Sequence, residues 1–515
     1  MPPVTPVRPA IALVGFMGAG KSTEARAIAS ALGEEPADVD ELIEAEAGRS
    51  VEDVFASEGE PAFRELEERI ALAALDRGGV VALGGGAVES ERVREALRDA
   101  VAVWCEVDED TAWSRCAGSR RPLARDRDEF ARRFAARRPL YEGVARAILP
   151  AGGAGVGAAA APWLAALRDA PDVRLAWAET ASASYPVLVG AGATGLMPSG
   201  SLAPGRRAFA IADGAAAEAC GELLPPVEAR VAVAGGEGSK TLAEAERVLE
   251  ELAEHGVRRD DALVAFGGGV VGDLAGFCAA VYQRGVPVVQ VPTTLVAQVD
   301  SAIGGKTGVD LPRAKNYVGA YHQPTAVLAD PGALRTLPRA ELAAGFAEVV
   351  KTALIAGGSL WERVRAIGGP DAESVAPLVF DCARTKVEVV AADERDAGLR
   401  AVLNLGHTVG HGIETAAGHG GIRHGEAVGL GLLASLRLSA VDELRDEVEA
   451  LLARAGLPTR IDPELDVEAV LDAVGRDKKR SADGIGFVLV REPGRVEHGQ
   501  RVGADTLRAA VEELT

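Results

Sequence analysis

The glycine-rich stretch GFMGAGKS at residues 15–22 is the feature that most constrains how this chain can fold. It overlaps the end of the apolar run AIALVGF at residues 10–16, which predicts a buried strand. Apolar residues at helical spacing follow, and this helix is expected to end near Gly33. A strand, a glycine loop and a helix in this order match the pattern GxxxxGKS, in which backbone N–H groups bind phosphate groups. Lys21 then reaches the β- and γ-phosphates of a nucleotide, and the Ser22 hydroxyl binds Mg²⁺.

Length and composition bound the remaining possibilities. A chain of 515 residues is too long for one ordinary core and predicts two or three domains. The net charge of −21 argues against nucleic acid or an anionic membrane as a general partner. No apolar run approaches the roughly 20 residues that span a bilayer, and the N-terminal residues lack the pattern of a secretion signal. The five cysteines lack CxxC spacing, which predicts reduced, buried thiols in a cytoplasmic protein.

Lysine is scarce, with 8 lysines against 47 arginines. Most of the lysines lie in motif-like settings such as GAGKST, GEGSK and GGKTG. A compact ammonium group is not interchangeable with a guanidinium group at a tight phosphate or proton-transfer site. The lysines together therefore indicate functional sites.

Several charged residues follow the phosphate loop within the first 150 residues. Asp38 and Asp40 close a second short strand, where residues two apart share a face and both carboxylates can point at one site. A turn or a helix cap is the competing interpretation of this pair. Arg64, Arg121 and Arg137 would be ordinary surface charges if each stood alone.

Residues 8–150 resemble shikimate kinase along nearly their whole length. The motifs that carry the resemblance are GFMGAGKST, DVDELIE, GEPAFRELE, LGGGAV, RRPL and RRPLY. ATP would be bound by Gly15, Gly18, Ala19, Gly20, Lys21, Ser22, Thr23 and Arg121. Shikimate would be bound by Asp40, Arg64, Gly84, Gly85, Gly86 and Arg137, with the two arginines on its carboxylate. The catalytic residues would be Asp38, near Mg²⁺ and the attacking hydroxyl, and Arg121, on a lid over ATP.

Strands alternate with helices from residue 172 to about 337, which predicts a parallel α/β sheet. After the strand ALVAF at 262–266, the sequence GGGVVGD contains a GxGxxG pattern through Gly267, Gly269 and Gly272. This pattern alone is a weak sign of a dinucleotide site, because no clear ribose-binding acid ends the next strand. Helices dominate after residue 338, so the cleft between sheet and helices is the expected active site.

Four of the chain's seven histidines crowd into residues 404–428. His407 and His411 stand four apart in a helical segment, so both face one side, and a glycine-rich turn can bring His424 back to them. Glu348 lies in an apolar helix, where a carboxylate needs a partner such as a metal ion. Such a set of ligands is typical of a zinc site that keeps a position open for substrate. The competing interpretation is that the histidines cap and pack a glycine-rich loop.

Residues 175–500 resemble 3-dehydroquinate synthase. The matching motifs are GGEGSK, GGGVVGDLAGFCAA, PTTLVAQVDSAIGGKTGVD, AEVVK, LRAVLNLGHTVGH, RHGEAV and DKK. The resemblance implies a zinc (or cobalt) ion on Glu348, His407 and His424, with His411 a catalytic or substrate-binding neighbour rather than a ligand. Asp396, where the family commonly has glutamate, is a departure that removes no ligand.

The same resemblance implies a cofactor site and a substrate site. NAD would be bound by Glu237, Lys240, Gly269, Gly272, Asp273, Thr293, Thr294, Lys306, Lys315 and Thr336. The heptulosonate phosphate substrate would be bound by Arg284, Asn316, Lys351, Lys386, Arg400, Asn404, His411 and Lys478 or its neighbour Lys479. The catalytic residues among these would be Lys351, Lys386 and His411. Arg284 would come from a neighbouring subunit, which implies a homodimer formed through the C-terminal half.

The expected architecture is α/β. It comprises a P-loop kinase domain at 1–155, an Ala/Gly/Pro-rich linker at 156–174, a Rossmann-like NAD domain at 175–337 and a helical zinc domain at 338–515. The expected protein is a bifunctional cytoplasmic enzyme of the shikimate pathway that acts on small molecules. It would phosphorylate shikimate to shikimate 3-phosphate with ATP and Mg²⁺. It would also convert 3-deoxy-D-arabino-heptulosonate 7-phosphate to 3-dehydroquinate and phosphate with NAD and zinc.

Two alternatives compete with this function. In the first, the same kinase is fused to another sugar-phosphate cyclase or to a metal-dependent alcohol dehydrogenase. Lys351, Lys386, Arg400 and Asn404 all suit the carboxylate-bearing substrate and so favour the leading function over this alternative. In the second, the chain is a binding or regulatory module with dead sites. That alternative predicts losses at Lys21, Asp40 or the metal ligands, and all of these residues are present.

Overall fold

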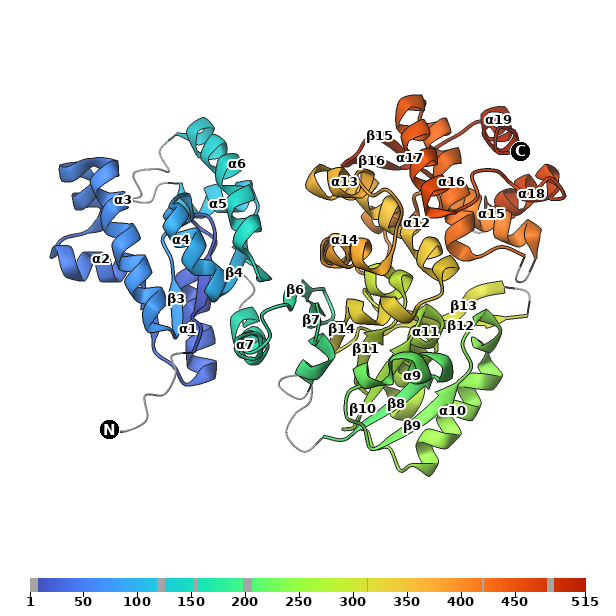
Figure 1. The fold of residues 1–515 in the computed structure, drawn as a ribbon, viewed down its shortest axis with the longest axis horizontal. Helices are drawn as coiled ribbons and strands as arrows, with labels where there is room; N and C mark the ends of the chain where they lie inside the picture. The colour runs from blue at the N-terminus through green and yellow to red at the C-terminus, as the bar shows by residue number, and fades with distance from the viewer. Residues whose placement is uncertain are drawn as a thin grey trace. The chain divides into compact units, whose positions relative to one another are not determined.

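The computed structural model describes residues 8–117, 126–151, 155–197, 206–312, 314–418, 421–478 and 486–515. The chain divides into two compact units (Figure 1). The first comprises Met1–Glu179 with Leu196–Gly200, and the second comprises Thr180–Gly195 with Ser201–Thr515. Within the described ranges, no helix is long and apolar enough to cross a membrane.

The first unit is built on parallel strands in the order β2-β3-β1-β4-β5-β6. Every residue of β1 and β3 is buried, because an interior parallel strand is covered on both faces. The strands are β1 (Ile11–Val14), β2 (Pro36–Asp38), β3 (Val80–Ala82), β4 (Val101–Glu106), β5 (Ala147–Pro150) and β6 (Arg174–Glu179). The helices are α1 (Lys21–Leu32), α2 (Val39–Ala47), α3 (Val51–Arg77), η1 (Ala87–Glu89), α4 (Glu91–Ala96), η2 (Leu97–Asp99), α5 (Glu109–Cys116), α6 (Arg127–Val144) and α7 (Val156–Leu167).

Two helices of the first unit place functional side chains. Helix α1 begins directly after the glycine loop and ends at Gly33, as predicted, where a φ of +68° suits a glycine cap. Helix α3 bends at Gly59, whose φ is +82°. The second half of α3, beyond this bend, carries Arg64 and Glu67 to the loop that follows β3.

The predicted linker at 156–174 is instead part of the first unit. Val156–Leu167 form helix α7, which packs against α1 and buries Trp163. The buried guanidinium of Arg168 then donates to both carboxylate oxygens of Glu34, at 2.7 and 3.0 Å. Strand β6 pairs with β5, so the sheet of the first unit continues past the predicted linker. A run of alanines suits a close helix contact as well as a linker, which is why composition misplaced this boundary.

The second unit begins with another parallel sheet, in the order β7-β14-β11-β10-β8-β9. Its strands are β7 (Ser184–Val189), β8 (Ala208–Asp213), β9 (Ala229–Val233), β10 (Ala262–Gly267), β11 (Val288–Pro292) and β14 (Ala326–Ala329). Its helices are η3 (Ala193–Leu196), α9 (Gly214–Cys220), η4 (Gly221–Leu223), η5 (Glu237–Ser239), α10 (Leu242–Glu254), α11 (Gly269–Val281), η6 (Tyr282–Arg284), η7 (Ala297–Ser301) and η8 (Pro331–Thr336). The antiparallel hairpin of β12 (Lys306–Leu311) and β13 (Ala314–Tyr321) stands beside this sheet. The alternation of strands and helices confirms the predicted α/β class.

Helices dominate the second unit after β14, and Figure 1 shows them in orange and red apart from the green strands. They are α12 (Arg339–Ala356), α13 (Gly358–Arg365), α14 (Ala372–Ala392), η9 (Leu399–Asn404), α15 (His407–Ala417), α16 (His424–Leu438), α17 (Asp442–Ala455), α18 (Val467–Lys478) and α19 (Ala504–Glu512). An antiparallel hairpin of β15 (Phe487–Glu492) and β16 (Arg495–Gln500) lies among them. Every residue of α12 from 342 to 354 is buried. A helix buried all round is central, and α12 packs on α13, α14 and α16.

Candidate functional site

The predicted phosphate loop connects β1 to α1. Its three glycines adopt positive φ, 147° at Gly15 and 83° at both Gly18 and Gly20. A Cβ at Gly15 would come within 2.7 Å of the carbonyl oxygen of Cys105 on strand β4, so only glycine fits there. Nζ of Lys21 donates to two loop carbonyls, one of them that of Gly15 at 2.9 Å. The ammonium group therefore lies over the loop whose phosphate it is expected to bind.

The other predicted nucleotide residues surround the same loop. Ser22 and Thr23 occupy the first turn of α1, and the N–H of Thr23 donates to Gly20 at 3.0 Å. Ala19 is fully buried within the loop. The remaining predicted residue, Arg121, lies outside the described residues.

Asp38 and Asp40 do not share a strand. Strand β2 ends at Asp38, and Asp40 lies in the first turn of α2. Oδ1 of Asp38 accepts the backbone N–H of Asp40 at 3.0 Å, so Asp38 is the N-cap of this helix. The predicted strand geometry is therefore wrong and the cap interpretation is right. Asp40 still reaches the loop after β3, because a Cβ at Gly84 would lie 3.4 Å from its Oδ1.

The glycines after β3 allow charged side chains to pack against the backbone. A Cβ at Gly84 would lie 2.0 Å from Oε1 of Glu67, and a Cβ at Gly86 would lie 2.1 Å from Nη1 of Arg64. A side chain at either glycine would therefore displace the ion pair between Arg64 and Glu67, in which Nη1 and Oε2 are 2.6 Å apart. The carbonyl of Gly85 accepts a 2.5 Å hydrogen bond from the Tyr141 hydroxyl.

Arg137 completes this cluster from α6. Its guanidinium is only 2% exposed, and it pairs with Glu89 at the end of η1. The structure thus brings together Asp40, Arg64, Arg137 and the three glycines, which are all the residues predicted for shikimate. We call this cluster the carboxylate pocket.

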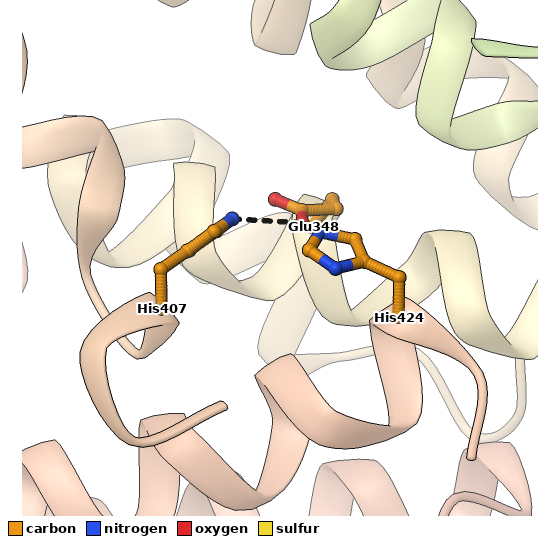
Figure 2. Close-up of side chains that lie close together, drawn as sticks. All are labelled: Glu348, His407 and His424. Atoms are coloured by element: carbon orange, nitrogen blue, oxygen red, sulfur yellow. Dashed lines mark ion pairs between the residues drawn. The ribbon is translucent and has the colours of Figure 1, made fainter. Parts of the chain in front are cut away.

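Glu348, His407 and His424 meet in the second unit from helices α12, α15 and α16. Figure 2 shows the three side chains pointing toward one another. Oε1 of Glu348 lies 3.6 Å from Nε2 of His407 and 3.4 Å from Nε2 of His424. Their ligand atoms all lie within 4.8 Å of one another, close enough for one metal ion. The ring of His411 stands 5.3 Å from that of His407, as its position four residues further along α15 predicts.

The electrostatics of this cluster suit a cation. Burial lowers the pKa of His407 to about 3, and Glu348 offsets only part of this effect, so the imidazole is neutral with a lone pair to donate. Burial also lowers the pKa of His424, but its contacts with Glu348 and Glu414 outweigh burial and raise the pKa to about 10. A cation held by Glu348 and His424 would take the place of that proton. Two imidazoles and a buried carboxylate fit zinc or cobalt, so the donor set fits the predicted metal.

Glu414 is a functional candidate that the sequence did not reveal. It lies on α15, and its Oε2 is 3.3 Å from Nδ1 of His424. Its other oxygen is 3.7 Å from Nζ of Lys315 on β13. A carboxylate on Nδ1 fixes the tautomer in which Nε2 is free to bind a metal. The spacing of seven residues from His407 puts Glu414 on the histidine face of α15, a signal that could have found it.

Asp300 is the second residue that sequence reasoning missed. It sits in η7, where Oδ2 is 2.7 Å from Nζ of Lys351 and Oδ1 contacts Nζ of Lys386. Burial would raise the pKa of Asp300, but the two ammonium groups outweigh it and hold the pKa well below its usual range. Lys351 also lies 2.6 Å from Glu348, so this charge network reaches the metal cluster. The only signal for Asp300 was its position inside the motif PTTLVAQVDSAIGGKTGVD.

A second network marks the predicted cofactor region. Lys240, 4% exposed, donates to Asp273 on α11 and to Asn316 on β13, both at 2.5 Å. Burial lowers the pKa of Lys240, but Asp273 and neighbouring carboxylates outweigh it and raise the pKa above the ordinary value. Lys315 also lies 4.0 Å from Glu237.

The loop from β10 into α11 has the shape of a nucleotide cradle. The N–H of Thr293 donates to Gly267 at 2.9 Å. A Cβ at Gly268 would lie 2.9 Å from the Thr294 side chain, and one at Gly269 would lie 2.8 Å from Oγ of Ser301. A Cβ on either glycine would therefore collide with a neighbouring side chain, so these positions require glycine. This loop at the N-terminus of α11 fits the pyrophosphate of NAD.

The remaining predicted residues occupy several places. Lys306 pairs with Asp396, with 2.6 Å between Nζ and Oδ2. Arg400 is 2% exposed and donates to the backbone carbonyls of Glu394 and Gly304. Gly272 packs against the side chain of Gln290, and the Thr336 hydroxyl donates to a backbone carbonyl within η8. The side chains of Arg284 and His411 are exposed. Asn404 is the last residue of η9. The side chain of Lys478, as well as Lys479, lies outside the described residues.

Comparisons with known families follow this division of the chain. Residues 17–166 match the family model "Shikimate kinase". Residues 230–344 match "3-dehydroquinate synthase N-terminal" and residues 345–480 match "3-dehydroquinate synthase C-terminal". The 3-dehydroquinate synthase of Symbiobacterium thermophilum is 43% identical over 350 residues, which are 64% of this chain and 98% of that protein.

Two solved structures resemble the second half of the chain. One is 2-deoxy-scyllo-inosose synthase complexed with carbaglucose-6-phosphate, NAD⁺ and Co²⁺. It is 26% identical with a TM-score of 0.58, over 66% of this chain and 100% of that one. The other is 2-epi-5-epi-valiolone synthase from Streptomyces hygroscopicus with NAD⁺ and Zn²⁺ bound. It is 27% identical with a TM-score of 0.59, over 64% of this chain and 97% of that one.

The phosphate loop and the carboxylate pocket define a P-loop kinase, and the parallel sheet followed by helices has the fold of the sugar-phosphate cyclases. The chain belongs to the 3-dehydroquinate synthase family and carries a shikimate kinase ahead of the synthase part. It is therefore a bifunctional enzyme of the shikimate pathway, a transferase in its first part and a lyase in its second.

Proposed function

We propose that the first unit phosphorylates shikimate through the residues of the carboxylate pocket. Arg64 and Arg137 bind the substrate carboxylate, a two-pronged contact suited to guanidinium groups. Asp40 accepts hydrogen bonds from the substrate hydroxyls. The observation that supports this assignment is that Asp40 and Arg64 lie against the glycines after β3, and that Glu89 joins Arg64 to Arg137.

The phosphate loop serves the same reaction. Lys21 leaves its loop carbonyls to bind the β- and γ-phosphates of ATP, and the first turn of α1 donates N–H groups to them. Ser22 holds Mg²⁺, and Asp38 lies at the start of α2 on the side of Asp40, near the attacking hydroxyl. Arg121, outside the described residues, is assigned to ATP binding.

For the second unit, we propose that Glu348, His407 and His424 hold zinc or cobalt, and that the cradle before α11 holds NAD. When bound, NAD⁺ accepts and returns a hydride, and the metal ion polarises the reacting oxygen. Lys240 and Asp273 hold the cofactor side of the site in place, with Glu237, Gly269, Gly272, Thr293, Thr294, Lys306, Lys315 and Thr336 around the cofactor.

The substrate side of the second unit carries both positively and negatively charged side chains. Asp300 keeps Lys351 and Lys386 together, and the three groups bind the polar atoms of the substrate and relay protons among them. His411, Asn404, Asn316 and Arg400 complete the contacts to the phosphate and carboxylate, with Lys478 or Lys479 as a further contact. Exposed Arg284 supports a homodimer in which it reaches the partner's site, and five free, buried cysteines support a cytoplasmic location.

A product assay on the full chain tests this proposal. In a first tube, NMR spectra would record the conversion of the heptulosonate phosphate in the presence of catalytic NAD⁺ and Zn²⁺. In a second tube, they would record the conversion of shikimate in the presence of ATP and Mg²⁺. We expect 3-dehydroquinate and phosphate in the first tube and shikimate 3-phosphate in the second. The structural likeness to other cyclases makes a carboxylate-free sugar phosphate the proper competitor substrate. Turnover of that competitor alone would contradict the assignment of the second unit.

The substitution Asp300→Asn tests the charge network in the same assay. It removes the carboxylate that joins Lys351 to Lys386 and leaves Lys351 paired with Glu348 alone, so kcat/KM of the synthase is expected to fall by on the order of 10²-fold or more. Kinase turnover by the same preparation is the internal control for folding and concentration. Glu443→Gln, an exposed charge change on α17, is the matched control. Synthase activity within twofold of the wild type in Asp300→Asn would remove Asp300 from the site.

A further inference from the structure

The two arginines of the carboxylate pocket are already bound to a carboxylate of this chain. Nε of Arg137 donates to Oε1 of Glu89 at 3.0 Å, and Nη2 donates to Oε2 at 3.1 Å. Nε of Arg64 lies 3.8 Å from the same Oε2. Glu89 therefore bridges two guanidinium groups in the two-pronged manner that a substrate carboxylate would use.

Arg64 has two further carboxylate partners, Glu67 and Glu60. Glu67 differs from Glu89 in its burial, and Glu60 differs in the second arginine that it contacts. Glu67 is 2% exposed and wedged against Gly84, so burial fixes it in place. Glu60 is partly exposed and contacts Arg64 at 3.0 Å, and its second cation is Arg133 rather than Arg137. Glu89 both bridges Arg64 and Arg137 and has a side chain 45% exposed to solvent. It is thus the carboxylate that can leave the pair without being pulled from a core.

We propose that Glu89 occupies the place of the substrate carboxylate in the resting kinase site and thereby sets the affinity of the first unit for carboxylate substrates. This inference rests on the proposed roles of Arg64 and Arg137. A substrate carboxylate can bind the pair only when Glu89 has moved out. The apparent affinity is therefore the intrinsic affinity reduced by the fraction of molecules in which the pair is open. Other small anions are excluded from Arg64 and Arg137 for the same reason, because they too must displace Glu89.

A structural role for Glu89 makes the opposite prediction. If Glu89 held Arg137 in the orientation that binds substrate, removing its charge would weaken shikimate binding. The sign of the change in affinity therefore separates the two roles. Since the Glu89 side chain is almost half exposed, its substitution leaves no buried cavity, and the fold is expected to persist.

The test measures kinase kinetics of the full chain with Glu89→Gln and a matched control. Glu91→Gln lies two residues further along, in the first turn of α4, and removes the same charge from an exposed side chain. We expect Glu89→Gln to lower the KM for shikimate by about two- to fivefold, the upper range for a partly exposed ion pair, with kcat and the KM for ATP little changed. Glu91→Gln is expected to leave all three constants within twofold of the wild type.

Competition by acetate gives a second readout that does not depend on shikimate turnover alone. Acetate should inhibit Glu89→Gln competitively against shikimate at a concentration several-fold lower than it inhibits the wild type, because the open pair accepts any small carboxylate. The carboxamide analogue of shikimate should gain no affinity in the variant. Thermal unfolding of both variants checks that the fold is intact.

The outcomes separate this inference from the function beneath it. A lower KM and stronger acetate inhibition, specific to Glu89→Gln, support the exchange. If the wild type phosphorylates shikimate but the KM of Glu89→Gln is unchanged or higher, Glu89 is a support for Arg137 and the inference is wrong. If the wild type neither binds nor phosphorylates shikimate, the assignment of the pocket fails and the inference fails with it. An equal decrease in the KM for shikimate in Glu91→Gln would show that the effect comes from long-range charge and would contradict the inference.

Discussion

Glu414 shows how one side chain can act on a metal ligand without being one. It faces Nδ1 of His424, while Glu348 faces Nε2 of the same ring. Burial would raise the pKa of Glu414, but its hydrogen bond with His424 and the nearby charges of His424 and Lys315 together outweigh burial and lower the pKa, so the carboxylate stays charged. The imidazole is thereby held by its far nitrogen, and its near nitrogen is directed at the other two ligands.

We expect Glu414→Gln to weaken metal binding about 10- to 100-fold. The amide can hold the ring but contributes no negative charge to it. Competition with a chromogenic chelator measures the affinity for Zn²⁺, and the visible spectrum of Co²⁺ reports the ligand geometry without any turnover. Glu443→Gln is the control. An unaltered affinity together with an unaltered Co²⁺ spectrum would show that Glu414 only neutralises Lys315.

Comparison of Glu348 with Asp300 shows what residue patterns could and could not predict. Glu348 was predictable because a carboxylate among apolar helical neighbours requires a nearby partner. Asp300 was not, because its partners Lys351 and Lys386 stand 51 and 86 residues away and meet it only in the folded chain. His407 was predictable from local helix geometry. Charge networks between distant helices leave no local pattern in the sequence.

At the scale of elements, the contact between α12 and α16 determines the metal cluster. A Cβ at Gly425 would lie 1.9 Å from the carbonyl oxygen of Ala344, so the two helices touch through bare backbone. Gly425 directly follows His424, and Ala344 lies one turn before Glu348. The distance between these two ligands therefore depends on a residue without a side chain.

The substitution Gly425→Ala is expected to push the two helices apart. We expect a loss of stability of about 1–3 kcal/mol from the clash and a clear loss of Zn²⁺ affinity. Gly475→Ala on α18 is the matched control, since a Cβ there meets open space and the change should stabilise the helix by about 0.5–1 kcal/mol. Calorimetry with and without Zn²⁺ measures both effects. Equal melting temperatures for the two variants would contradict the close contact.

The turn before η9 predicts how the stability of the fold changes at low pH. Backbone N–H groups of Ala397 and Arg400 donate to Asp393, at 2.9 and 3.0 Å, and lower its pKa to about 2. The unfolded value is about 3.9, so the stabilisation is complete above about pH 4 and is lost as the pH falls through about 2. Urea unfolding at stepped pH should show a smaller acid loss for Asp393→Asn than for the wild type. Exposed Asp472→Asn should follow the wild type.

Element boundaries failed where two local preferences competed. Asp38 satisfies both a strand end and a helix cap, and the cap prevailed because its oxygen accepts an otherwise unpaired N–H. The segment 156–174 has the composition of a linker, yet its alanines form a helix that packs on α1. The strand-loop-helix around Lys21 was predicted correctly because each piece has its own independent signal.

At the scale of the whole molecule, the two sites use separate residues, and we expect separate loss of their activities. Lys21→Ala should abolish phosphorylation of shikimate and leave synthase turnover within twofold. A chelator that binds Zn²⁺ far more tightly than Mg²⁺ should abolish synthase turnover alone, and added Zn²⁺ should restore it. Both activities are measured on one preparation of the full chain. Loss of synthase turnover in Lys21→Ala would mean that the sites depend on each other.

The membership of α7 in the first unit bears on where the kinase part could be cut from the full chain. A fragment that stops at the end of β5 would lack α7 and leave the apolar surface of α1 without its cover, which invites self-association. A fragment that continues to Glu179 keeps this cover. The alanine-rich residues of α7 thus act as a packed part of the first unit and not as a free spacer.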